Sequence, residues 1–377
     1  MTNLDDVYDV IIVGGSFAGL STAYFTDADR ILILERQERL GLRQRSTCCT
    51  SVEWLKKLGC EKSILKTFDT MTFHSSSGST AVAELPVSFA TIDYRPFCET
   101  LGSNLKNADI ITGTNVVGIK DAPEKRVLSN KGEFRGGVVV DCSGWRAVVA
   151  SHLTSQRYVD KSKLAYGIEV ETEYEGDTNT IHIYYGKKFI KQGYAWIFPT
   201  GEEKARIGLG GYCKFDTRRY LQSFVDFLGV KSDNINPHGG AIPCHGLRES
   251  VVDGIFVVGD SDGQVLPLVG EGIRKSLYYG EICGKLITRV VKGEMELSEA
   301  LDAYREEVNK SLKFYNTLYF AQNMAVHAPD WARNKAIKKL SEMESKTIKR
   351  VTENYLNDAI ISSRFRITMK LLGAILF

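Results

Sequence analysis

A glycine-rich turn near the N-terminus has the residue types and the spacing of a dinucleotide-binding site. Residues 9–19 read DVIIVGGSFAG, so a run of branched apolar residues stops at Gly14. A buried parallel strand enters a helix in this way, and phosphate groups bind at the N-terminus of such a helix. Gly14 permits the tight turn, and Gly19 lets the helix pack close to its strand. Ser16 replaces the middle glycine of the GxGxxG pattern, although Gly15 keeps the backbone permissive there.

A carboxylate and several arginines follow this turn. The next strand, ILILE, ends at Glu35, whose carboxylate is placed to hold a ribose hydroxyl group. The basic segment RQERLGLRQRSTCCTSVEW comes after it and is too irregular for a strand, so we predict a loop close to phosphate. Arg43 or Arg45 could pair with a pyrophosphate in this loop. The alternative interpretation is a solvated basic loop.

The cysteines have no spacing that indicates a metal site. The eight lie at positions 48, 49, 60, 98, 142, 213, 244 and 283, without paired CxxC spacing or a His cluster. We therefore predict no zinc or iron–sulfur centre, and thiols buried in a reducing compartment. Cys48 and Cys49 are adjacent and cannot easily bridge each other. One thiol facing the cofactor beside a second, buried thiol is the expected arrangement.

The composition is that of a globular protein of about two domains, with 377 residues, 43% hydrophobic and 25% charged. A net charge of +2 gives no electrostatic reason to expect nucleic acid. No secretory signal precedes the first strand and no run of about 18 apolar residues could span a bilayer, so we expect a cytoplasmic enzyme. The last stretch, RFRITMKLLGAILF, is either a docked helix or a peripheral contact with the inner face of the cell membrane.

The elements that must position these residues follow in order along the chain. Residues 71–85 predict a hairpin around SSGS, and residues 93–105 predict a helix with Asp93 near its cap. A strand-like segment, ADIITGTNVVGI, comes next. Residues 125–140 predict two strands that end in VVVDCSGW, at the carboxyl edge where open parallel sheets bind ligands.

The hydrophobic period changes to two between Leu164 and Cys213, which predicts an antiparallel sheet that forms a substrate domain. The helix DTRRYLQSFVDFLG follows. The strand GIFVVGD then returns the chain to the first domain and ends at Asp260, before a glycine-rich turn and a helix from about Gly270. Residues 297–377 predict a set of helices.

Four separated segments together resemble the flavin proteins of the aromatic hydroxylase type, over residues 9–286. They are GGSFAG, IDYRPFCETL, DCSGW, and GGAIP followed by VVGDSDGQVLPLVGEGI. GYAWIFP, at residues 193–199, is similar to the YxWxFP motif of geranylgeranyl reductases, and STCC lies where those proteins carry a cysteine. The chain therefore resembles the geranylgeranyl reductase family, whose archaeal members saturate the isoprenoid chains of membrane lipids.

This resemblance implies an α/β fold with a Rossmann-like FAD-binding domain, an inserted antiparallel substrate domain and a C-terminal helical region. The implied FAD-binding domain is discontinuous and comprises residues 1–68, 91–150 and 246–292. Residues 69–90 and 151–245 form the implied substrate domain, and residues 293–377 form the helical region.

The resemblance also implies roles for single residues. The FAD pyrophosphate would lie over Gly14, Ser16 and Gly19, the adenosine ribose at Glu35, and the adenine against the backbone of Val116. Asp260 would hold the ribityl or pyrophosphate end, and the isoalloxazine would meet the backbone of Pro267, Gly270, Gly272 and Ile273. Further implied FAD contacts are Phe17, Ala18, Arg36, Arg45 and, at the start of its helix, Arg95. Departures from the family pattern occur at Ser16, Cys49 and Glu271.

The implied reaction is hydride transfer from reduced FAD to a carbon–carbon double bond of a geranylgeranyl chain. Tyr194 and Trp196 alternate with Ala195, so both would face one side and wall a lipid cavity; the alternative is ordinary core packing. Cys48, or Cys49 in its place, is our candidate proton donor or ordering contact. No second glycine-rich strand and helix is present for a nicotinamide domain, so electrons would come from docked NAD(P)H or from a ferredoxin.

Other functions of the same fold remain as alternatives. A halogenase motif needs tryptophan where this chain has Tyr194 and isoleucine where it has Phe198. A hydroxylase is harder to separate by residues alone. A prenyl-quinone reductase differs only in the substrate, and a prenyl-lipid binding protein without redox chemistry would not need the flavin-contacting positions.

Overall fold

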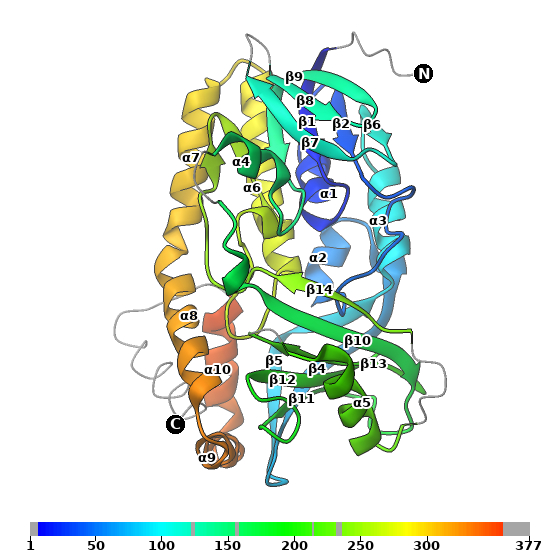
Figure 1. The fold of residues 1–377 in the computed structure, drawn as a ribbon, viewed down its shortest axis with the longest axis vertical. Coiled ribbons are helices and arrows are strands. Elements are labelled where there is room, and N and C mark those ends of the chain that lie inside the picture. Colours follow the sequence, from blue (N-terminus) through cyan, green and yellow to red (C-terminus); the bar gives the residue numbers. More distant parts are fainter. Residues whose placement is uncertain (1–6, 122–124, 155–157, 213–214, 231–235, 357–377) are drawn as a thin grey trace.

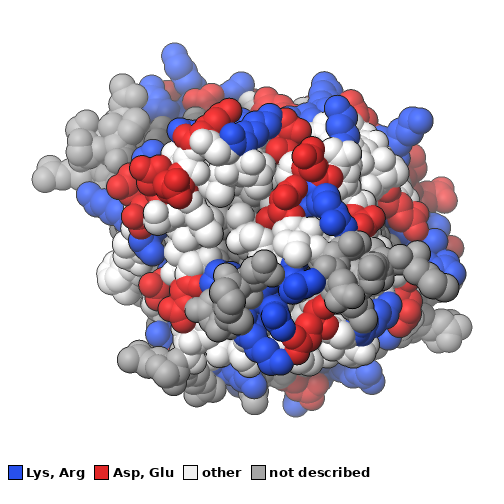
Figure 2. All heavy atoms as spheres, turned by 90° about the horizontal axis from the view of Figure 1, so that it is seen from above, with Lys and Arg blue, Asp and Glu red and all other residues white. Residues whose placement is uncertain are grey.

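The computed structural model describes residues 7–121, 125–154, 158–212, 215–230 and 236–356. These residues form two sheets, which Figure 1 shows one above the other, with long helices α7 and α8 along one side. We call them the first sheet, which contains the N-terminal strand, and the second sheet. Figure 2 shows the face seen from above, where basic and acidic side chains are interspersed.

The first sheet is built around β1 (Val7–Val13), which pairs in parallel with β2 (Ile31–Leu34) and with β9 (Gly132–Asp141). β1 and β2 are almost continuously apolar because helices or loops cover both of their faces. β6 (Ala108–Ile111) extends the sheet beyond β2, and β16 (Ile255–Val257) and β15 (Val251–Val252) extend it beyond β9. β8 (Lys125–Ser129) and β7 (Val116–Asp121) branch off this order, because β8 also pairs with β9.

The segment predicted as one strand, ADIITGTNVVGI, is two strands, because the chain turns at Gly113 with a φ of +62°. β6 then pairs with β2, whereas β7 pairs with β8. Helices α1 (Phe17–Tyr24) and α6 (Ile273–Val291) pack closely on this sheet. α6 begins at Ile273 rather than near Gly270. α3 (Tyr94–Ser103) starts at Asp93, whose side chain accepts from the Arg95 N–H as expected.

The second sheet has the order β14-β10-β13-β12-β11-β4-β5-β3, and only its β11–β4 pair is parallel. Its strands are β3 (Cys49–Ser51), β4 (Ile64–Ser75), β5 (Thr80–Ile92), β10 (Ala165–Glu173), β11 (Ile181–Tyr185), β12 (Gly193–Pro199), β13 (Lys204–Gly211) and β14 (His238–Ile242). The period-two pattern between Leu164 and Cys213 is thus confirmed for the described strands. Cys213 itself lies outside the described residues.

The basic segment after β2 was predicted to be a loop, but its last residues form a strand and the start of a helix. Its residues Cys49–Ser51 form β3, which pairs with β5, and Val52–Lys57 form α2. Backbone pairing with Ala90 and Phe89 overrides the irregular local pattern. β3 and the start of β4 belong to the second sheet although they precede residue 69, and the domain limits stay a prediction.

One face of the second sheet is covered by α5 (Thr217–Phe227). Val170, Ile197, Ile207 and Leu209 point to this side and pack on Leu221, Phe224 and Val225 of the helix. Alternate residues of the same strands point to the opposite face, toward the first sheet, and include polar and aromatic side chains. The residues of the candidate site lie on that face.

The described part of the chain ends with α7 (Leu297–Lys310), α8 (Leu312–His327), α9 (Asp330–Ser341) and α10 (Ser345–Leu356). α7 packs on α6, and α9 and α10 pack on β5. Short helical pieces complete the described chain: α4 (Val148–Leu153), Glu61–Ser63, Lys161–Lys163 and Gly259–Ser261. Within the described residues, the helices are too short or too polar to cross a membrane. The stretch RFRITMKLLGAILF lies outside the described residues.

Two phenylalanines of α5 give a test of how the second sheet is stabilised. Phe224 is 1% exposed against the sheet, whereas Phe227 is 46% exposed on the same helix. We expect Phe224→Ala to lower the free energy of unfolding by about 3–5 kcal/mol, because it leaves a core cavity. Phe227→Ala is the matched control and should cost about 1 kcal/mol or less. Urea unfolding followed by circular dichroism measures both, and equal losses would contradict this account of the core.

Candidate functional site

The glycine turn after β1 is too crowded for side chains. Gly14 has a φ of +112°, and a Cβ atom there would lie 2.3 Å from the carbonyl oxygen of Cys142. A Cβ atom on Gly19 would lie 1.9 Å from the carbonyl oxygen of Gly14. The two glycines therefore allow β1, β9 and α1 to meet closely, as the sequence pattern predicts.

The N-terminus of α1 is suited to an anion. Ser16 occupies the N-cap position but its side chain makes no capping hydrogen bond, and the first turn holds no acidic residue. The Ser16 hydroxyl lies instead 2.8 Å from the Tyr94 hydroxyl. Phe17 packs against the rings of Tyr94 and Phe97. The first-turn N–H groups and the positive end of the helix dipole are thus available to a phosphate.

Glu35 lies beside this turn in the position expected for a ribose contact. Its buried carboxylate accepts the Gly15 N–H at 2.8 Å and the Gln37 N–H at 2.8 Å. Each oxygen keeps a further lone pair that a sugar hydroxyl group could use. The Thr114 N–H also bonds to the Glu35 carbonyl at 2.8 Å, which brings the start of β7 at Val116 to the same end of the molecule. These groups fit the adenosine half of a dinucleotide.

Four arginines converge near this end. Burial and the like charges of Arg36, Arg146 and Arg43 lower the pKa of Arg45. Arg146, which the sequence analysis did not single out, comes from the turn after β9 and stacks on Trp145, 4.6 Å from its ring centre. Such a group of cations favours a polyanionic ligand. Arg95 donates from its Nε to Glu99 at 2.7 Å, and its predicted FAD contact stays a prediction.

The segment before α6 joins the two sheets. The Tyr194 hydroxyl of β12 donates to the Val269 carbonyl, and a Cβ atom on Gly270 would lie 3.5 Å from that hydroxyl. Tyr212 likewise bonds to the carbonyl of Leu268, which has a φ of +76°. Two tyrosines of the second sheet therefore hold the backbone that runs from the buried Pro267 to Ile273.

Asp260 lies close to the same segment. A Cβ atom on Gly272 would lie 3.3 Å from its Oδ1, and a Cβ atom on Gly259 would lie 2.8 Å from Ala18 of α1. Burial raises the pKa of Asp260 to about 6, against the opposing charge of Arg248. The structure thus brings Asp260 between the helix that would receive the pyrophosphate and the segment that would meet the isoalloxazine.

Trp196 and Tyr194 share the face of the second sheet that α5 leaves uncovered. One row of residues across the strands runs from Trp196 through Gly208 and Glu169 to His238 on the edge strand. The row beside it consists of Tyr194 and then only glycines: Gly210, Gly167 and Gly240.

The indole of Trp196 extends over these glycines. A Cβ atom on Gly210 would lie 3.2 Å from its Cζ3, and one on Gly208 would lie 2.7 Å from its Cε2. This surface without side chains was not predicted. The sequence indicates it only through the alternating glycines of GLGG at residues 208–211, whose effect becomes clear once the strand partners are known.

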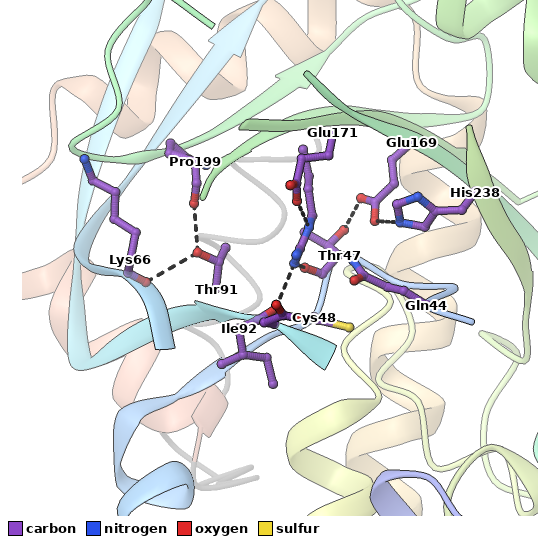
Figure 3. Close-up of polar contacts among 12 residues, drawn as sticks. Gln44, Thr47, Cys48, Lys66, Thr91, Ile92, Glu169, Glu171, Pro199 and His238 are labelled. Atoms are coloured by element: carbon purple, nitrogen blue, oxygen red, sulfur yellow. Dashed lines mark hydrogen bonds and ion pairs between the residues drawn. The ribbon is translucent and has the colours of Figure 1, made fainter. Parts of the chain in front are cut away.

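A buried polar network lies beside Trp196. Glu169 is 2% exposed, and its Oε2 accepts from the Trp196 indole at 3.0 Å. The same oxygen accepts from the Thr47 hydroxyl at 2.7 Å, and Oε1 lies 2.8 Å from His238 Nε2 (Figure 3). Arg206 donates to Glu171 at 2.9 Å and to the carbonyl oxygen of Thr47 at 2.7 Å. Apart from Trp196, none of these residues was predicted as part of the site.

The two adjacent thiols lie on different sides of β3. Cys48 has a φ of +52° and is buried in the core with Phe97 and Cys98 of α3, and burial raises its pKa to about 12. Cys49 packs instead against the cluster that contains Trp196. Burial also raises the Cys49 pKa. Both thiols stay protonated at neutral pH, and Cys49 is the one beside Trp196 and Tyr194.

Comparisons with known proteins test the family resemblance that the sequence motifs indicate. The family model "Geranylgeranyl reductase catalytic domain" matches residues 163–240. The chain is 27% identical to "Digeranylgeranylglycerophospholipid reductase 2" of Methanothermobacter thermautotrophicus, over 81% of this chain and 85% of that protein. The resemblance indicated by the sequence motifs is therefore confirmed.

Two solved structures share the fold at low sequence identity. A geranylgeranyl bacteriochlorophyll reductase-like protein of Thermoplasma acidophilum matches with a TM-score of 0.83 and 16% identity, over 97% of this chain and 99% of that one. The p-nitrophenol 4-monooxygenase of Pseudomonas putida matches with a TM-score of 0.75 and 15% identity, over 93% and 98%. The predicted fold class is confirmed.

Asp260 gives a pH-dependent prediction. Its carboxyl ionises near pH 3.8 when unfolded and near pH 6 when folded, so this group costs stability progressively as the pH rises through that window. We expect Asp260→Asn to raise the melting temperature of the ligand-free protein by about 4 °C at pH 7.5, with little change at pH 4.

The exposed Asp226→Asn serves as the matched control and should change neither value. Differential scanning calorimetry at the two pH values measures the effect. An equal shift at both values, or destabilisation at pH 7.5, would contradict a folded-state cost of ionising Asp260.

Proposed function

The chain is related to the geranylgeranyl reductase family, and from this relation we propose that it is an FAD-dependent oxidoreductase. The proposed reaction saturates carbon–carbon double bonds in geranylgeranyl chains. The geranylgeranyl chains of membrane ether lipids are the first substrates to test. The observation that carries the proposal is the contact between Tyr194 and the Val269 carbonyl. It joins the segment assigned to the isoalloxazine to the strand that carries the YxWxFP motif.

FAD would be held by the groups described above: the turn at Gly14–Gly19, Glu35, the arginines beside Arg45, Asp260 and the segment 267–273. Reduced FAD would supply the hydride when bound. The protein must then position the chain, exclude water and deliver one proton for each double bond.

The described residues around Tyr194 suit an uncharged chain. Trp196 and Tyr194 present apolar ring surface, and burial keeps the pKa values of Tyr194 and Tyr212 well above their usual range, so both hydroxyls stay neutral. The charged side chains nearby, Glu169 and Arg206, are engaged in hydrogen bonds. A wall of this kind would hold a prenyl group without exposing it to an unpaired charge.

An aromatic-type hydroxylase is the second candidate, because the fold is shared with p-nitrophenol 4-monooxygenase. The two functions differ in their need for oxygen. Hydroxylation consumes oxygen and adds it to the substrate, whereas saturation proceeds without oxygen and adds only hydrogen.

The electron donor and the membrane contact are part of the proposal. The donor would be external, either NAD(P)H or a ferredoxin. A substrate embedded in lipid would require peripheral contact with a membrane, which is supported by the exposed aromatics Trp331, 68% exposed, and Phe320 on the C-terminal helices. A prenyl quinone is the alternative substrate.

The proposed activity can be tested directly. Dithionite-reduced, FAD-loaded protein is incubated anaerobically with geranylgeranyl ether lipids or with prenyl quinones, and the products are analysed by mass spectrometry. We expect a gain of two hydrogens per double bond in the lipids. Oxygenated products formed only in air would favour the hydroxylase, and purified protein that does not take up FAD would contradict both candidates.

The thiols give a second prediction. The assignment of Cys48 stays a prediction, and we propose that Cys49, which packs beside Trp196, contacts the substrate. Cys49→Ala should lower turnover roughly tenfold with FAD still bound, because a shortened wall lets the chain leave the productive geometry. Cys48→Ala should lower stability while the folded, FAD-loaded fraction keeps its turnover. The reverse pattern would return the role to Cys48.

A further inference from the structure

We propose that Glu169 is a positioning residue of the site, because one buried carboxylate holds both Trp196 and the segment that carries the two thiols. This inference rests on the proposed function for its chemistry, but the contacts themselves do not. Glu169 comes from β10 and contacts Trp196 of β12. It also contacts His238 of β14 and the loop at Thr47 (Figure 3).

The contact between Glu169 and Trp196 depends on the glycine that separates them in the sheet. Gly208 lies between the two residues in the cross-strand row. A Cβ atom there would lie 2.5 Å from the Glu169 Cβ and 2.7 Å from the Trp196 Cε2. The missing side chain lets the indole N–H reach the carboxylate across a whole strand. The orientation of the indole is therefore set by Glu169.

The same carboxylate oxygen holds the thiol segment. The Thr47 hydroxyl donates to Oε2 at 2.7 Å, and the Thr47 carbonyl accepts from Arg206 at 2.7 Å. Thr47 is thus fixed to the second sheet from both its side chain and its backbone. Cys48 and Cys49 follow directly, so their positions depend on this anchor.

The hydrogen bonds around Glu169 explain why a carboxylate is tolerated there. His238, whose side chain is 26% exposed, meets its other oxygen from the edge strand. Arg206 lies in the next row and is itself paired with Glu171. A buried carboxylate is costly unless its oxygens are hydrogen-bonded, and three donors from separate parts of the fold meet that need here. Two of the three, Thr47 and Trp196, belong to the site or adjoin it.

A double-mutant cycle tests this role. Glu169→Gln keeps the volume but replaces one acceptor oxygen by an NH2 group, so one oxygen remains for the three donors Thr47, Trp196 and His238. We expect turnover at saturating substrate to fall about tenfold, with a smaller change in KM and a broader distribution of partly saturated products. In a Trp196→Phe background, the effect of Glu169→Gln should shrink at least about threefold, because Phe has no indole N–H to lose.

Glu173→Gln is the matched control, since it lies on the same strand and the same face but is exposed and opposite Lys204, away from Trp196 and Thr47. It should leave the product distribution unchanged. Additive effects of Glu169→Gln and Trp196→Phe, or equal effects of Glu169→Gln and Glu173→Gln, would overturn the proposal.

A spectroscopic measurement keeps this test independent of the proposed reaction. The near-ultraviolet circular dichroism of Trp196 is the difference between the wild-type and Trp196→Phe spectra. We expect Glu169→Gln to abolish most of that difference while its far-ultraviolet spectrum stays native. An unchanged Trp196 signal would overturn the positioning role. Failure of the wild type to saturate any prenyl chain would overturn the proposed function alone.

Discussion

The buried carboxylate of Glu169 is the interaction on which the geometry of the candidate site depends. An ionised group in the interior is stable only when its oxygens are hydrogen-bonded, and here the donors come from Thr47, Trp196 and His238. Meeting that need fixes a loop, a central strand and an edge strand relative to one another. In the next row of the sheet, Arg206 also joins separate parts of the fold, because it donates to Glu171 and to the Thr47 carbonyl.

The face that carries this network includes a row of glycines beside Tyr194, and their missing side chains shape the site. Glycines opposite Tyr194 leave the indole of Trp196 lying over bare backbone. The other face of the same strands is ordinary core under α5. Tyr194 and Tyr212 then bind the segment before α6, so the strand with the aromatic motif and the proposed flavin segment are held together.

Local patterns in the sequence predicted the parts of the site that are continuous in the chain. The turn at Gly14 and the period-two strands follow from residue types within a few positions of one another, and the structure has both, whereas the ribose contact of Glu35 stays a prediction. The position of Glu169 could not be predicted, because its partners lie up to 122 residues away and meet it only through strand register. The sides taken by Cys48 and Cys49 depend on the pairing of β3, which the basic local sequence gave no reason to expect.

In the proposed reaction, the two sheets bring a reduced flavin and a prenyl double bond together without oxygen. The decisive measurement is flavin absorbance during a single turnover, after anaerobic mixing of reduced, FAD-loaded protein with a geranylgeranyl ether lipid. We expect the flavin to be oxidised in the absence of oxygen, with one double bond lost for each flavin. A flavin that stays reduced until oxygen is admitted would rule out the proposed reaction.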